Sequence, residues 1–364
     1  MEWHSRRSAS NQAGFTLVEI MVGLGIGMLA TVIIIQVISV FETQRRTTTG
    51  TADAQTNGAI ALYNIARELQ MAGYPLEPVT NSALECTTLT VNGAAATPAR
   101  LSPIVVTDNV AGAGVNASPS DRITIRYGTS AMGGVPTQIS GPPIGNAVPV
   151  ASNLGCQIGD MTLIINGTTC AMSSVTAVTG NTAGNMTVTL ADTTGANSSA
   201  SLACMGTWNE VTYAVNNGNL ERNGVPSVAG IVNLQVQYGI SASGLPNSDP
   251  NFNRITQWVD ASGATWTTPT VLNRNRIIGV RIAVVARNAK MEPGVVTAAC
   301  SSTTLAAPSG LCAWDATSAA PAVASPAPAI DLSAGDPNWL SYRYRVFETI
   351  IPLRNMVWAK DTLP

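Results

Sequence analysis

The sequence predicts an α+β protein in which one long N-terminal helix, membrane-spanning in its first half, packs on an antiparallel β-sheet with large loop insertions. Two patterns carry this prediction. From Phe15 to about Ala72 the apolar side chains follow a helical pattern, first as a continuous run and then as a stripe. The rest of the chain consists of short segments with alternating apolar residues, separated by loops rich in Gly, Pro, Ser, Thr and Asn.

The apolar run predicts a membrane-spanning helix. It begins abruptly at Phe15, continues to Phe41 and contains a single charge, Glu19. As a helix it is about 40 Å long, which is enough to cross a bilayer. A polar segment with Arg6 and Arg7 precedes the run, whereas a secretory signal peptide has its cleavage site after a shorter apolar core.

Two features within the run have more than one interpretation. At membrane depth Glu19 needs a partner or a cavity, but close to the interface headgroups could keep it hydrated. Gly23 and Gly27 form a small-xxx-small pair that would let a second helix approach closely, although glycine is also simply common in membrane helices.

The second half of the predicted helix is amphipathic. Its apolar stripe is formed by Ile60, Leu62, Tyr63, Ile65, Ala66 and Leu69. Gly73, followed by Pro75, is a good stop signal. A single helix from Phe15 to Ala72 would be about 87 Å long, with its second half packed on the rest of the chain.

The remaining residues predict strands joined by long loops at about 92–120, 128–155 and 291–338. Ile277–Arg287 is the most apolar segment and is the expected central strand. The low-complexity segment Ala319–Ala329 should be extended. The other expected strands are Arg122–Tyr127, Met161–Ile165, Met186–Leu190, a hairpin of Val211–Val215 with Leu220–Arg222, Val232–Tyr238, and Tyr342–Ile351.

Composition argues against several functional classes. Charged residues make up 11% of the chain and the net charge is −2, so no basic surface for nucleic acid is expected. The only histidine is His4, which excludes His-dependent catalysis and His-ligated zinc from the rest of the chain. No nucleophile elbow or phosphate-binding loop occurs, so neither a cofactor nor a metal site is expected. Loop aspartates (Asp249, Asp315, Asp331, Asp336) and tryptophans (Trp208, Trp258, Trp266, Trp314, Trp339) are expected in turns and in the core.

The six cysteines indicate disulfides formed in an oxidising compartment rather than a metal site. They are Cys86, Cys156, Cys170, Cys204, Cys300 and Cys312, and none belongs to a C-x-x-C pair. Buried free thiols are the alternative. Fifteen pairings are possible. Cys300 with Cys312 is the nearest pair, and Cys156 with Cys170 is the next local candidate.

The string Gly14-Phe15-Thr16-Leu17-Val18-Glu19 resembles the class III signal of type IV prepilins and of type II secretion pseudopilins. The resemblance implies that a prepilin peptidase cuts after Gly14 and that Phe15 becomes the N-methylated first residue. It also implies that Glu19 pairs with the N-terminal amine of a neighbouring subunit during assembly. The family's common helix-loosening proline is missing here.

Four further pieces resemble the PilW branch of minor pilins: Ala66–Tyr74, Tyr213–Gly224, Ile231–Gly239 and the ending Arg345–Asn355. The implied domains are a leader (1–14), an assembly helix (15–73) and a periplasmic β-rich domain (74–364). The implied function is a non-enzymatic minor pilin that primes pilus assembly at or near the filament tip. A J-type pseudopilin of type II secretion, an adhesin or DNA-uptake subunit, and an anchored periplasmic enzyme are the alternatives.

The implied partners are the prepilin peptidase, other minor pilins, the major pilin and the inner-membrane assembly platform, with no nucleic acid. The implied location is the inner membrane, with a single pass and a periplasmic C-terminal domain, and then the pilus. Because Arg6 and Arg7 on one side of the span are balanced by Arg45 and Arg46 on the other, this orientation rests on the resemblance and on the cysteines.

Overall fold

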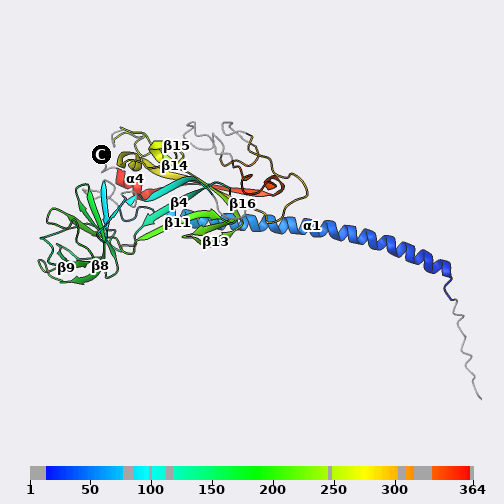
Figure 1. Cartoon of the computed structure of the whole chain (residues 1–364), viewed down its shortest axis with the longest axis horizontal. Helices are drawn as coiled ribbons and strands as arrows, with labels where there is room; N and C mark the ends of the chain where they lie inside the picture. The colour runs from blue at the N-terminus through cyan, green and yellow to red at the C-terminus, as the bar shows by residue number, and fades with distance from the viewer. Residues whose placement is uncertain are drawn as a thin grey trace, which may run out of the picture. The chain divides into compact units, whose positions relative to one another are not determined.

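The computed structural model describes residues 14–76, 86–97, 101–111, 118–244, 248–301, 309–314 and 330–360. The chain divides into two compact units, Met1–Gly50 and Thr51–Pro364. Helix α1 (Leu17–Leu69) is continuous through both of them (Figure 1). This confirms the expected long N-terminal helix, and the α+β class holds for the chain. Ala319–Ala329 lies outside the described residues.

The second unit contains three sheets where one was expected. The largest has eight strands in the order β2-β1-β8-β7-β10-β5, with β9 on β8 and β6 on β9. Strands β1 and β8 run parallel, so the expectation of a wholly antiparallel sheet is wrong for this pair. The members are β1 (Thr88–Val91), β2 (Ala94–Ala96), β5 (Thr137–Gln138), β6 (Ala147–Pro149), β7 (Met161–Asn166), β8 (Thr169–Thr179), β9 (Thr187–Leu190) and β10 (Ser201–Cys204).

The expected loops therefore contain strands. The segment 92–120 holds β2 and the later strand β3, and the segment 128–155 holds β5 and β6. Strands as short as β2, β5 and β6 leave almost no alternating pattern, which is why the sequence did not predict them; β3 has seven residues and was missed. In the third loop, 291–338, the described residues form no strand.

The other two sheets are antiparallel. The five-stranded sheet has the order β13-β12-β11-β4-β3, and the four-stranded sheet has the order β15-β14-β16-β17. The first consists of β3 (Ile104–Val110), β4 (Ser120–Tyr127), β11 (Asn209–Asn216), β12 (Asn219–Arg222) and β13 (Val225–Ala229); the second of β14 (Ile231–Ser241), β15 (Ile255–Val259), β16 (Ile277–Arg287) and β17 (Tyr344–Pro352). The expected hairpin forms, and Ile277–Arg287 lies inside its sheet as predicted.

Side chains of β4 connect these two sheets. β15 pairs only with the last part of β14, so the amides of Leu234 and Val236 lack a strand partner on that side. The hydroxyl of Ser120 accepts from the Leu234 amide (2.9 Å), and the carboxyl of Asp121 accepts from the Val236 amide (2.6 Å). These two polar side chains are therefore buried because they satisfy backbone groups that no strand reaches.

Both faces of the four-stranded sheet are covered, so β14 is buried along its entire length. One face packs against the five-stranded sheet and the second half of α1 in the main hydrophobic core. The other face is covered by loop residues, among them Leu311, Trp314 and Trp339. Arg281 lies on this second face, 4.1 Å from the ring centre of Trp314 and 5.1 Å from that of Trp258. The continuous apolar pattern of β16 reflects this burial on two sides.

Candidate functional site

The N-terminal segment has the geometry of a capped helix start. Helix α1 begins directly after Thr16. The Thr16 hydroxyl accepts from the Glu19 amide (3.3 Å), and the Glu19 carboxylate accepts from the Thr16 amide (2.9 Å) and from the Thr16 hydroxyl (2.9 Å). This reciprocal pattern is a capping box, and it satisfies two backbone donors that a helix start leaves free.

Gly14 precedes this cap and is exposed. Apart from its chain neighbours, no described residue lies within 4 Å of the position that a Cβ would occupy there. The expected cleavage site lies immediately before the first residues of the capped helix.

The first part of α1 exposes an apolar surface on all sides. Phe15, Met28 and Phe41 are 85%, 74% and 67% exposed, and none of the most apolar 18-residue window is buried. That window has a mean hydropathy of 2.4. Within the described residues this is one helix that is long and apolar enough to cross a membrane.

The glycines of this part leave open surface. Nothing lies within 4 Å of a Cβ built on Gly23 or on Gly27. The close approach of a second helix along this side remains a prediction.

The second half of α1 packs on the sheets of the second unit. Its buried face is formed by Ala54, Ala61, Ile65 and Leu69, each 3% exposed or less. Gly58 belongs to the same face, because a Cβ there would lie 2.1 Å from Cε2 of Phe347 on β17. These spacings of three and four residues follow the helical period.

The predicted stripe is partly wrong. Ile60 and Tyr63 are 45% and 65% exposed, because they lie beside this face rather than on it. Small residues form much of the true contact surface. The sequence prediction weighted large apolar side chains and therefore missed Ala54, Gly58 and Ala61.

Polar contacts fix the end of this helix. Arg222 donates to Oε1 of Glu68 from both Nε (3.0 Å) and Nη2 (2.8 Å). Burial, together with the Glu68 carboxylate, raises the pKa of the neighbouring Tyr213 hydroxyl. After the helix Gly73 has a φ of 82°, which confirms it as a stop residue, and Asn355 donates to the Ala72 carbonyl (2.9 Å).

The six cysteines form three disulfides. Cys300 pairs with Cys312, as the sequence suggested, while Cys86 pairs with Cys170 and Cys156 with Cys204. The suggested Cys156–Cys170 pair is wrong, since Cys170 lies on β8 with its side chain in the core cluster around Cys86. Cys156 and Cys204 lie with a different cluster.

The described residues contain no group of three or more His, Cys, Asp or Glu side chains that could hold a metal ion. The carboxylates of Asp249, Asp331 and Asp336 accept from backbone amides two residues further on, as in turns. Asp315 is outside the described residues. Trp258, Trp314 and Trp339 are buried, and Trp208 and Trp266 are partly buried in core clusters.

Two family models match the chain. Residues 192–355 match the type IV pilus-assembly protein W, PilW, and residues 9–35 match the prokaryotic N-terminal methylation motif. This confirms the PilW resemblance. The PilW segment contains β10 to β17, and the methylation motif contains Gly14, the capping box and the start of α1. Together they support a type IV pilus-related pilin, and the one long apolar helix among the described residues fits an inner-membrane anchor.

The search of curated proteins and the search of solved structures each found no match.

The roles of Gly14, Phe15 and Glu19 in cleavage, methylation and assembly stay predictions, and the capping role of Thr16 was not predicted. No role was expected for Thr16, although Thr-x-x-Glu immediately before an apolar helix is the spacing of a capping box. That signal was available, and it would have placed the start of the helix between Thr16 and Leu17.

Proposed function

We propose that this PilW-type protein is a minor pilin, made as a precursor that is cut after Gly14 and then assembled through residues 15–73. The observation that carries the proposal is the capped helix start, which lies within the matched methylation motif. Its role is structural rather than catalytic. The leader is residues 1–14, and 74–364 is the periplasmic domain.

The cap lies entirely on the mature side of the proposed cut. Thr16 and Glu19 hold the first turn of α1 with their own hydrogen bonds, so removal of the leader leaves the turn intact. The cut creates an amine on Phe15, which the prepilin peptidase methylates. The same cut exposes the end of a helix whose first turn is already formed.

Glu19 then has two partners, one before assembly and one during it. In the single chain its carboxylate is held by Thr16. During assembly it pairs with the Phe15 amine of a neighbouring subunit, which replaces a neutral contact with a matched charge pair and sets the axial register. Contacts with other minor pilins, the major pilin and the inner-membrane assembly platform follow from this step.

The large second unit, Thr51–Pro364, supports a position at or near the filament tip. A domain of this size is easier to place at the end of a filament than in its repeating wall. There it primes assembly from the inner membrane and is later carried to the cell surface.

The cleavage step is tested with Gly14→Val. The extra side chain blocks close approach of the peptidase, so intact precursor accumulates in the membrane and is measured by N-terminal sequencing and intact mass. Gly27→Ala is the control, because its surroundings are equally open, and it should be cut normally. A Gly14→Val protein that is cut normally, or native filaments that contain Met1, would contradict the proposal.

The assembly step is tested by separating the cap from the charge. Glu19→Gln retains the acceptor of the capping box and loses the charge, whereas Glu19→Ala loses both. If pairing with an amine drives assembly, both variants are cleaved but are absent from filaments, as measured by immunoblots of sheared fibres. Normal incorporation of Glu19→Gln would show that the cap, not the charge, is what assembly requires.

A further inference from the structure

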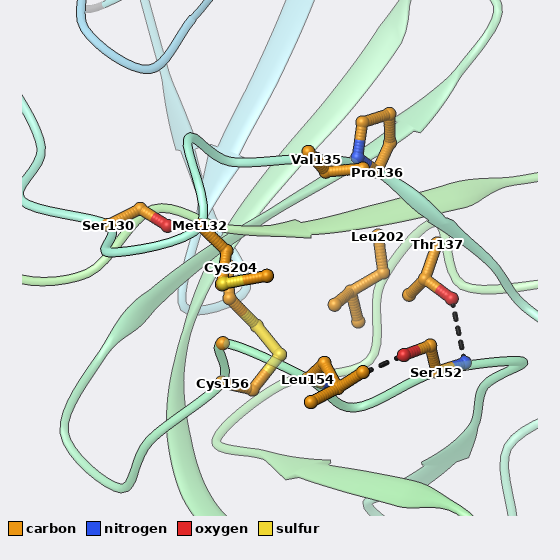
Figure 2. A pocket seen from close by; sticks show the side chains of 11 residues that line it. Ser130, Met132, Val135, Pro136, Thr137, Ser152, Leu154, Cys156, Leu202 and Cys204 are labelled. Carbon is orange, nitrogen blue, oxygen red and sulfur yellow. Dashed lines mark hydrogen bonds between the residues drawn. A yellow bond between two sulfur atoms is a disulfide. The ribbon is translucent and has the colours of Figure 1, made fainter.

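A pocket of about 230 Å³ lies beside the large sheet, where the loop before β5 and the loop after β6 meet β10 (Figure 2). Leu202 and the disulfide Cys156–Cys204 line its interior. Apart from the β10 residues Leu202 and Cys204, the lining precedes residue 192 and so lies outside the PilW match. Most of the pocket's lining is therefore outside the matched segment, whereas Leu202 and Cys204 lie within it.

The rim of the pocket is apolar and exposed. Met132, Val135 and Leu154 are 51%, 68% and 76% exposed. Leu202, by contrast, is fully buried at the base. Every described residue that lines the pocket is uncharged. A charged group would lose its hydration here without gaining a counter-ion, so the pocket favours an uncharged apolar occupant.

Three hydroxyl groups line the pocket, and all three are available to it as hydrogen-bond donors. Ser130 Oγ accepts from the Gly134 amide (3.1 Å), Thr137 Oγ1 from the Ser152 amide (2.9 Å), and Ser152 Oγ from the Leu154 amide (3.3 Å). Figure 2 shows the last two of these bonds as dashed lines.

Each oxygen is thus fixed by a backbone donor, while its own proton has no acceptor among the residues that the structure describes. Ser130 is only 4% exposed, so water has little access to it. A ligand that offers hydrogen-bond acceptors would satisfy these protons.

The volume restricts the size of the occupant. Pockets for drug-sized ligands usually measure about 300–1,000 Å³, and this one is smaller. A lipid acyl chain would need a longer channel. One aliphatic side chain fits, and the carbonyl groups on either side of it in an extended peptide are the acceptors that the hydroxyls lack.

We propose that this pocket binds one uncharged apolar side chain, together with its flanking carbonyls, from an extended segment of another protein chain. Such a side chain acts as the anchor of a protein contact, surrounded by the apolar rim. The proposal concerns the pocket itself and does not depend on pilus assembly.

The chemistry is tested with N-acetyl-leucine methylamide. The full chain is labelled with ¹³C-methyl methionine and held in detergent micelles, and the ligand is titrated into it. Binding should shift the Met132 methyl signal and saturate at millimolar ligand, as expected for so small a ligand. Met291, which is 50% exposed, is the matched control and should not shift. Equal binding of N-acetyl-aspartate methylamide, equal shifts of both methionines, or no saturation would overturn the proposal.

Variants test the two kinds of contact separately. Leu154→Asp should weaken binding at least about tenfold by placing a charge on the rim, whereas Val225→Asp, at a similarly exposed position (65%), should not. Thr137→Val should weaken it by about fivefold through loss of one donor, and Thr137→Ser should restore it. Unchanged binding by both Leu154→Asp and Thr137→Val would exclude this pocket.

The source of the anchor is tested with a photo-crosslinking residue at position 154 in cells, with position 225 as the control. The expected adduct joins position 154 to a peptide of another protein that carries an uncharged aliphatic residue at the link. Adducts to this chain's own residues 77–85, adducts to lipid, or the same adducts from both positions would overturn the proposal.

Discussion

The packing of α1 on the second unit depends on the missing side chain of Gly58. A Cβ built there lies 2.1 Å from Cε2 and 2.3 Å from Cδ2 of Phe347, whereas ordinary contacts begin at 3.4 Å. The ring would have to move by more than about 1 Å, and overpacking of this kind costs about 1–3 kcal/mol. Alanine in a helix gains about 1 kcal/mol over glycine. Gly58→Ala should therefore lower the free energy of unfolding by up to about 2 kcal/mol.

The sign should reverse when the ring is removed. In a Phe347→Ala background Gly58→Ala no longer meets an obstacle, so it should stabilise the protein by about 1 kcal/mol through helix propensity alone. The assay is denaturant unfolding of the full chain in detergent, followed by near-ultraviolet circular dichroism. Gly27→Ala, with open space around its Cβ position, is the control and should not destabilise. Stabilisation by Gly58→Ala with Phe347 present, or the same effect in both backgrounds, would refute this account of the packing.

Three further predictions concern stability. Burial raises the pKa of Asp121 to about 7, so the folded protein holds this proton more tightly than the unfolded chain does. The resulting contribution to the free energy of unfolding is complete below the unfolded pKa near 3.9 and is lost as the pH rises through 7. Between pH 5 and pH 8 the free energy of unfolding, measured by urea titration, should fall by roughly 2–3 kcal/mol more in the native protein than in Asp121→Asn. An equal fall in both proteins would contradict this. Arg222→Ala removes the ion-pair partner of the largely buried Glu68 and should lower the free energy of unfolding by about 1–3 kcal/mol. Adding Glu68→Gln should recover part of this loss. No recovery would argue against the ion pair. Replacing Cys300 and Cys312 with serine should lower the free energy of unfolding by about 2–3 kcal/mol and change tryptophan fluorescence. Unchanged fluorescence would show that the disulfide does not hold the loop on the sheet.

The sequence predicted the long helix, its stop at Gly73 and the longer strands, because these features extend over enough residues to show a period. It could not predict the eight-stranded sheet, since β2, β5 and β6 are two or three residues long. Their partners are set by tertiary contacts rather than by local preference.

Arg281 illustrates a second limit. The segment Ile277–Arg287 was correctly predicted to be an inner strand, but nothing in the sequence shows that its Arg281 is only 1% exposed. The buried guanidinium donates to Gln237 and lies over the rings of Trp258 and Trp314, and these contacts offset part of the cost of burying its charge. These residues come from distant parts of the chain.

The candidate site could be named without knowledge of the fold, and the roles of its residues stay predictions. Gly14, Phe15 and Glu19 lie in one short string, so no tertiary information was needed to find them. The pairing of Cys156 with Cys204 was not predictable, because the separation of 48 residues contains no local signal and the nearer Cys170 lies in another core cluster.

The double coverage of the four-stranded sheet limits how this protein can meet its neighbours. Over β14 and β16, α1 and a second sheet cover one face and the residues around Trp314 and Trp339 cover the other, so neither face of these two strands is free to receive another molecule. Contacts made by this part of the chain must therefore use strand edges and loops. These are places where substitutions can change a partner's preference without disturbing the interior.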